Sequence, residues 1–125
     1  SVNDHVGAFW DLLPTFCELA GADIPAGIDG HSLVPTLTGR GEQPAHDYLY
    51  WEFHEQGGKQ AVRRGDWKGI RLNVLEDPNG PIELYYLPDD PGETTDVAGR
   101  HPEIAAEMDR LMEEARTPSE VFSFR

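Results

Sequence analysis

The sequence has few cysteines and few positive charges. Its single cysteine, Cys17, cannot form an internal disulfide, so cysteine usage indicates no redox compartment. Only 10 Lys and Arg oppose 23 Asp and Glu among 125 residues, for a formal net charge of -13. Because binding to phosphates requires clustered basic side chains, this balance argues against nucleic acid and against an acidic membrane surface as partners.

Long apolar runs are also missing. None approaches the roughly 20 residues that a membrane-spanning helix requires, so we expect no membrane partner. The rest of the composition, 38% hydrophobic and 26% charged, is typical of globular protein. The sequence begins at Ser1 without Met, which leaves both a processed protein and an excised fragment open.

No motif typical of a catalytic centre is present. His54-Glu55 begins like a zinc-protease motif, but the second His that this motif needs is replaced by Gly58. Residues 64–66 and 89–93 are interpreted as turns, not as an adhesion motif or a calcium loop. Cys17 lies in an apolar helical stripe, where packing is the expected role. The sequence therefore predicts no catalytic residue and no metal ligand of its own.

The first part of the chain is predicted to be helical. Apolar side chains recur at steps of three and four between Asp4 and Gly21. We expect a helix that starts near Asp11, with Asp11 as its N-cap, and ends at Gly21. A second short helix is expected at residues 31–39, capped by Ser32 and with Leu37 on its buried side.

The pattern changes to a period of two after a Gly- and Pro-containing linker, so we place a domain boundary between residues 42 and 43. Short links between the later segments favour an antiparallel sheet. We expect an α+β fold in which a four-stranded antiparallel sheet is covered by a C-terminal helix. The expected strands are 46–53, 60–64, 67–74 and 82–87, and the expected helix is 101–116.

The segment between the first two expected strands holds the candidate binding residues. His54, Glu55, Gln56 and Lys59 surround the pair Gly57-Gly58. In so acidic a chain, a His and a Lys on one loop can bind an anionic or polyhydroxyl ligand. An exposed polar loop without a ligand remains the alternative. The aromatic residues have two readings as well, because sheet packing and sugar stacking both use them: Tyr48, Tyr50, Trp51 and Trp67.

Four stretches together resemble a known family. They are D-L-L-P-T with E-L-A-G at 11–21, D-G-H-S-L at 29–33, G-D-W-K at 65–68, and I-E-L-Y-Y-L running into D-P-G-E-T-T-D-V at 82–97. In order and spacing they resemble the C-terminal quarter of arylsulfatase-like sulfatases, which belong to the alkaline phosphatase superfamily. Two positions depart from that pattern, since Tyr86 stands where Asp is usual and Asp96-Val97 replaces Asn-Leu.

The resemblance implies where the chain sits in a larger fold. Residues 1–42 would be the terminal helical segment of a large α/β domain, and residues 43–125 would form the C-terminal antiparallel-sheet subdomain. In this family, formylglycine made from a Cys or Ser attacks sulfur, and calcium polarises the sulfate oxygens. Cys17 lacks the Pro and Arg of the modified motif, so we expect calcium and formylglycine upstream, in the parent enzyme.

We therefore expect the C-terminal fragment of a sulfatase that hydrolyses sulfate esters. It would complete the fold and border the substrate pocket, with His54 and Lys59 bound to a sulfated small molecule or carbohydrate and Glu55 and Gln56 beside them. Its expected partner is the missing N-terminal catalytic domain, or a second copy through the apolar stripe of residues 4–39.

Two alternatives stay open. One is the same region of a related phosphodiesterase or phosphonate hydrolase. The other is a free-standing carbohydrate- or protein-binding module. The family suggests a periplasmic or secreted enzyme, and the residues themselves do not decide the compartment.

Overall fold

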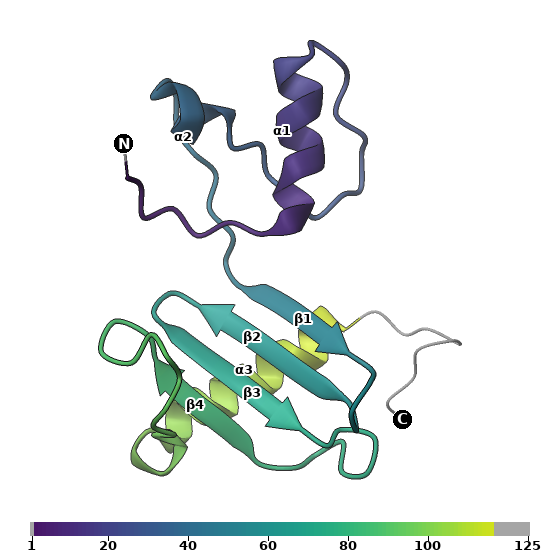
Figure 1. Cartoon of the computed structure of the whole chain (residues 1–125). Coiled ribbons are helices and arrows are strands. Elements are labelled where there is room, and N and C mark those ends of the chain that lie inside the picture. The colour runs from purple at the N-terminus through teal and green to yellow at the C-terminus, as the bar shows by residue number, and fades with distance from the viewer. Residues whose placement is uncertain (1, 117–125) are drawn as a thin grey trace. The chain divides into compact units, whose positions relative to one another are not determined.

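The computed structural model describes residues 2–116 and divides the chain into two compact units. We call Ser1–Asp47 the helical unit and Tyr48–Arg125 the sheet unit (Figure 1). The assignment of these parts to a large domain and a subdomain, with a boundary after residue 42, stays a prediction. Among residues 2–116, none of the helices has the length and hydrophobicity of a membrane-spanning segment.

The helical unit contains a short 3-10 turn, η1 (Phe9–Asp11), followed by the helices α1 (Leu12–Leu19) and α2 (Val34–Thr38). Pro14 lies in the first turn of α1, where its missing N–H removes no helical hydrogen bond. The helix ends before Gly21, whose φ of 69° is in the left-handed region that glycine adopts at low cost.

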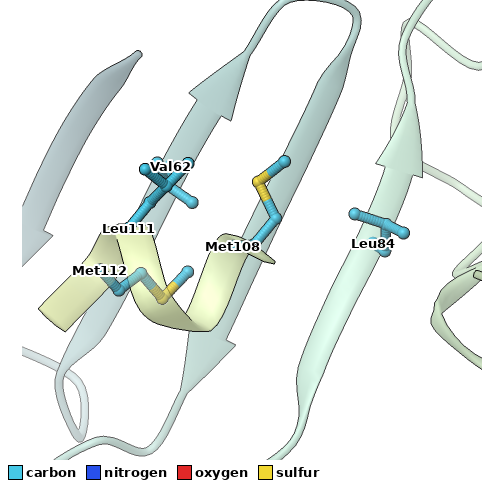
Figure 2. Packing of buried hydrophobic residues seen from close by; sticks show 5 residues of the cluster. All are labelled: Val62, Leu84, Met108, Leu111 and Met112. Atoms are coloured by element: carbon cyan, nitrogen blue, oxygen red, sulfur yellow. The ribbon is translucent and has the colours of Figure 1, made fainter. Parts of the chain in front are cut away.

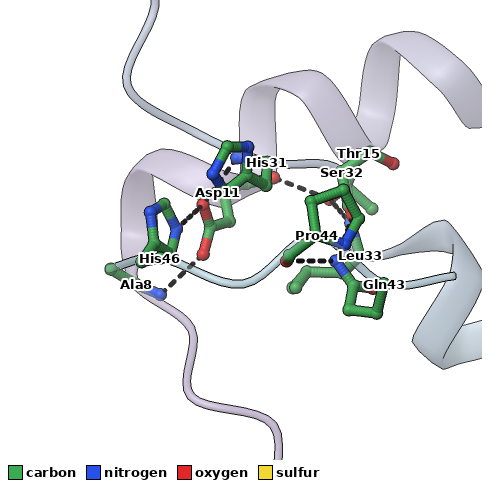
Figure 3. A network of polar contacts seen from close by, with 9 residues as sticks. All are labelled: Ala8, Asp11, Thr15, His31, Ser32, Leu33, Gln43, Pro44 and His46. Carbon is green, nitrogen blue, oxygen red and sulfur yellow. Dashed lines mark hydrogen bonds and ion pairs between the residues drawn. The ribbon is translucent and has the colours of Figure 1, made fainter. Parts of the chain in front are cut away.

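The predicted capping role of Asp11 is wrong. Asp11 directly precedes α1 and holds its N-cap position, but its side chain accepts no hydrogen bond from the backbone N–H groups of α1. Its carboxylate instead accepts hydrogen bonds from the backbone N–H groups of Ala8 and His31 and contacts His46 (Figure 3). The predicted capping role of Ser32 is wrong as well, because Leu33 holds the N-cap position of α2 and no side chain among the described residues caps this helix. The Ser32 hydroxyl, one residue earlier, accepts a hydrogen bond from the Val34 N–H at 3.2 Å.

The apolar stripe of the helical unit is largely exposed. The exposed fractions of Phe9, Leu13, Phe16 and Leu19 are 89%, 51%, 61% and 60%. The predicted buried position of Leu37 is wrong, because 66% of this residue is exposed. The unit is too small to cover its own apolar side chains within the residues that the structure describes.

The sheet unit has the predicted α+β architecture. Its four antiparallel strands lie in the sheet in the same order as in the sequence, so each strand pairs with the strand that follows it in the chain. The third helix packs across one face of the sheet (Figure 1). The strands begin or end one to three residues away from their predicted bounds. The elements are β1 (Leu49–Phe53), β2 (Lys59–Arg64), β3 (Trp67–Leu72), β4 (Ile82–Tyr86), a 3-10 turn η2 (Ala98–Arg100) and α3 (Pro102–Ala115).

The core lies between α3 and the sheet. The register sets Val62 opposite Gly69 and Gly69 opposite Leu84, so these three residues face the helix from adjacent strands. Gly69 permits close approach, because a Cβ there would lie 2.8 Å from the Cβ of Met108. Figure 2 shows the fully packed cluster, which consists of Val62, Leu84, Met108, Leu111 and Met112.

The opposite face of the sheet is less covered. Trp51, Phe53 and Leu72 alternate with inward-facing neighbours and have exposed fractions of 37%, 47% and 43%. We call these three residues the open sheet face. Its position follows from the strand period of two, which sends successive side chains to opposite faces.

Candidate functional site

The loop at residues 54–58 joins β1 to β2 and has a fixed backbone. Gln56, Gly57 and Gly58 have φ values of 54°, 85° and 81°, all in the left-handed region. The carbonyls of Gly57 and Gly58 accept hydrogen bonds from the N–H groups of Leu75 and Val74 at 3.0 and 3.1 Å. These bonds tie the loop to the segment after β3, so the two glycines serve a defined turn.

The structure brings two of the four predicted site residues into direct contact. The Lys59 ammonium donates a hydrogen bond to Oε1 of Gln56 at 3.0 Å and lies 5.8 Å from the centroid of the Phe53 ring. Gln56 and Glu55 are exposed, whereas Lys59 and His54 are half-buried. Lys59 is therefore held above the open sheet face with its position set by the loop.

His54 belongs to a second set of contacts, centred on Glu52. Nε2 of His54 lies 3.0 Å from Oε2 of Glu52. The other oxygen of this carboxylate accepts hydrogen bonds from the Tyr50 hydroxyl at 2.6 Å and from Nε of Arg116 at 2.9 Å. Glu52 thus holds the imidazole of His54 at the edge of the loop, although the sequence analysis did not single it out.

The same network continues across the sheet. Gln60 donates to the Tyr50 hydroxyl at 2.9 Å and accepts from Arg71 at 3.3 Å. Arg71 is 2% exposed, and it also donates to the Gly80 carbonyl at 2.9 Å and to Asp109 at 2.6 Å. The signal in the sequence was the strand period, because Tyr50, Glu52 and His54 fall on one side of an extended chain.

Burial raises the pKa of the Tyr50 phenol well above its usual range, and the hydrogen bond to Glu52 adds to this effect. Tyr50 is therefore a neutral hydroxyl that donates to Glu52 while it accepts from Gln60. The charge of Glu52 is met by Arg116 on the other side. We call this chain of contacts from His54 to Arg71 the Glu52 network.

The chemistry that this arrangement can perform is binding and orientation. The loop presents an ammonium, an imidazole, an amide and a carboxylate, which can donate to and accept from hydroxyl or sulfate oxygens. In residues 2–116 no group of three His, Cys, Asp or Glu side chains could hold a metal ion. Cys17 lies in α1, and it is not part of the loop at residues 54–58.

Comparison with known proteins places the chain in a family. The family model of the C-terminal region of N-sulphoglucosamine sulphohydrolase matches residues 1–118. A Δ4,5-hexuronate-2-O-sulfatase of Bacteroides thetaiotaomicron is 35% identical over 113 residues, which are 87% of this chain and 23% of that protein. Human arylsulfatase A is 31% identical, with 88% of this chain and 26% of that protein covered.

Solved structures agree with these matches. A structure in complex with its substrate, D-glucosamine-2-N,6-O-disulfate, has a TM-score of 0.67 and 29% identity, and it covers 84% of this chain and 23% of that one. The chain thus spans about a quarter of the length of its relatives, in their C-terminal region. This chain belongs to the sulfatase family, in which it corresponds to the C-terminal portion.

Proposed function

We propose that this chain is the C-terminal part of an enzyme that hydrolyses sulfate esters, and that it completes the fold and borders the substrate pocket. The observation that carries the proposal is the ordered loop at residues 54–58. It presents binding groups, while the described residues contain no metal-binding cluster. The family match over residues 1–118 supplies the reaction class.

The partner of this chain is the catalytic part of the same enzyme. Two apolar surfaces are available for it, namely the stripe of Phe9, Leu13, Phe16 and Leu19 and the open sheet face. Burying apolar surface stabilises an assembly by roughly 25 cal/mol per Å². Exposed patches of this kind mark interaction sites. A second copy of the chain is the alternative occupant when the catalytic part is absent.

The ligand of the loop is a sulfated saccharide. Lys59 and His54 bind the alcohol or sugar side of the sulfate ester, Gln56 holds Lys59, and Glu55 accepts from a hydroxyl at the exposed rim. The charges favour a sulfated saccharide, because the loop offers an ammonium group and an imidazole to the anionic ligand in a chain that is otherwise acidic. The names of the hexuronate sulfatase and of the disulfated glucosamine complex point to the same class.

Calcium and formylglycine belong to the upstream part of the enzyme. The residues of this chain do not fit either group, since no cluster of three metal-ligating side chains occurs within residues 2–116 and Cys17 lacks the flanking residues of the modified motif. The contribution of this chain is therefore to bind and orient the substrate.

The test uses the intact parent enzyme with two substrates, a sulfated disaccharide and 4-nitrophenyl sulfate. We expect Lys59→Ala and His54→Ala to raise KM for the disaccharide by roughly tenfold, which corresponds to the loss of one hydrogen bond to a charged group. The small aryl ester does not reach the loop, so its KM should hardly change. Glu76→Gln, an exposed substitution on the link between β3 and β4, is the matched control.

Equal losses for both substrates would show that the variants damage the fold instead of a binding contact. Unchanged kinetics for both would remove the loop from the pocket. Hydrolysis of a phosphonate ester in place of both sulfate esters would favour the phosphonate hydrolase alternative.

A further inference from the structure

A cavity of about 490 Å³ opens at the end of the sheet unit opposite the β1–β2 loop. Trp67, which begins β3, and Tyr86, which ends β4, contribute to its wall. The loop at residues 54–58 instead contacts Val74 and Leu75, beyond the other end of β3. Cavities that bind small molecules have volumes of roughly 300–1,000 Å³, so this one is large enough for a sugar residue.

One wall of the cavity is aromatic. The ring of Trp67 lies 4.8 Å from the ring of Tyr86 and 5.0 Å from the ring of His101, measured between centroids. The interplanar angle is 47° between Trp67 and Tyr86, a tilted arrangement, and 61° between Trp67 and His101, an edge-on arrangement. Both are favourable geometries for aromatic contacts. All three are half-buried, which leaves part of this aromatic surface accessible from the cavity.

The polar groups of the lining divide into those that build the loop and those that remain available. Asp90 builds the loop, since its carboxylate accepts hydrogen bonds from the N–H groups of Thr94 and Thr95, each at 2.9 Å. Asp89 and Arg100 are exposed, and neither side chain makes a hydrogen bond or ion pair with another residue in the range 2–116. The cavity thus has a fixed frame together with one unused acceptor and one unused donor group.

We propose that this cavity binds an uncharged pyranose residue. The apolar C–H face of the sugar packs on the aromatic wall of Trp67, Tyr86 and His101. Its hydroxyl groups donate to the Asp89 carboxylate and accept from the Arg100 guanidinium. Two carboxylates face one permanent positive charge in this lining, which disfavours a sulfate or uronate group.

The site is independent of the proposed contacts of His54 and Lys59, because no residue is shared between the two sets. The cavity would bind one unsulfated sugar unit of a glycan. Either proposal can therefore fail while the other holds.

The experiment is a titration of the 125-residue chain with N-acetylglucosamine, and separately with its 6-sulfate ester, followed by NMR of the tryptophan indole N–H groups. The chain has three tryptophans, Trp10, Trp51 and Trp67, so two of them serve as internal references. We expect the Trp67 signal alone to shift and to saturate, with a Kd near about 1 mM. The sulfated sugar should bind roughly tenfold more weakly.

Variants at exposed positions separate binding from folding. Asp89→Asn and Arg100→Gln should each weaken binding of N-acetylglucosamine by roughly tenfold, whereas Glu76→Gln should leave it unchanged. The dispersion of the same spectra reports that each variant is folded. The proposal is overturned if Trp67 does not respond to the neutral sugar at about 50 mM, well above the expected Kd. It is equally overturned if only the sulfated sugar binds, or if the three variants behave alike.

Discussion

Oδ1 of Asp11 lies 2.7 Å from Nε2 of His46, so a fully buried carboxylate joins residues 35 positions apart within the helical unit. The same side chain accepts hydrogen bonds from the N–H of His31 at 2.8 Å and from the N–H of Ala8 at 2.9 Å. The rings of His31 and His46 stand 4.4 Å apart, between centroids, beside it (Figure 3). One carboxylate therefore connects three segments, at residues 8–11, 31 and 46, of a unit that has little apolar core.

The first prediction concerns this carboxylate. Asp11→Asn should lower the free energy of unfolding of the helical unit by about 1–3 kcal/mol, because the new amide group would point N–H donors at existing donors. Hydrogen exchange of the backbone amides of His31 and Ala8 measures the effect. Asp23→Asn, at an exposed position of the same unit, is the control and should change little. Equal exchange in both variants would mean that Asp11 contributes no stability.

The second prediction is a pH dependence. Burial by itself would raise the pKa of Asp11, but the hydrogen bonds from His31 and Ala8 and the contact with His46 outweigh it and hold the pKa below the usual 3.8. A group whose pKa is lowered by folding adds stability that is complete above its unfolded pKa and disappears as the pH falls through its folded pKa. The difference in the free energy of unfolding between the native chain and Asp11→Asn should thus shrink as the pH falls below 3.8. A difference that grows on acidification would contradict the assignment.

The third prediction tests the contact between sheet and helix. A Cβ on Gly69 would lie 2.8 Å from the Cβ of Met108, so Gly69→Ala should push α3 away from β3. We expect a loss of about 1–3 kcal/mol in the free energy of unfolding, measured by urea denaturation of the sheet unit. Gly99→Ala is matched to it, since nothing lies within 4 Å of the added Cβ and the backbone there is not left-handed. If both variants unfold at the same urea concentration, the close approach is wrong.

The fourth prediction separates two partners of one ion pair. Arg71 is buried, whereas the side chain of Asp109 is 52% exposed. Arg71→Met should cost about 3 kcal/mol, because it leaves the Gly80 carbonyl and the Gln60 amide oxygen without their donor. Asp109→Asn should cost less than about 1 kcal/mol, as for surface pairs. Thermal unfolding of the two variants gives the comparison, and a larger loss for Asp109→Asn would contradict the network.

The local pattern of the chain was enough to predict the sheet and its helix. The alternation over residues 67–74 and the pair Gly65-Asp66 predicted a hairpin, and β2 and β3 meet there with Arg64 opposite Trp67. The helix expected at 101–116 forms as α3, and its apolar side chains Ile104, Met108 and Leu111 pack on the sheet. These predictions are confirmed because they depend on the hydrophobic period of a short stretch of sequence, which needs no distant residue.

The partners of the polar side chains were not predictable in this way. The neighbours of Asp11 fit the pattern of a helix cap, while the distant partners of its carboxylate are at positions 31 and 46. The sequence places His54 in a loop, but only the folded sheet unit brings Arg116, 64 residues further along the chain, to the Glu52 carboxylate that contacts His54. Leu37 is exposed for the same reason, because only the packing of the whole chain decides which apolar side chains are buried.

Local spacing and short motifs are enough to give the strands, the main helices and the family to which the chain belongs. Each of these is written in local spacing or in short motifs that stay together along the chain. Only the folded chain shows that Arg116 reaches Glu52, that Arg71 is buried among polar partners, and that Trp67, Tyr86 and His101 meet at one cavity. The physical reason is that such contacts join residues far apart in sequence, and chain packing, which local propensity does not encode, selects them.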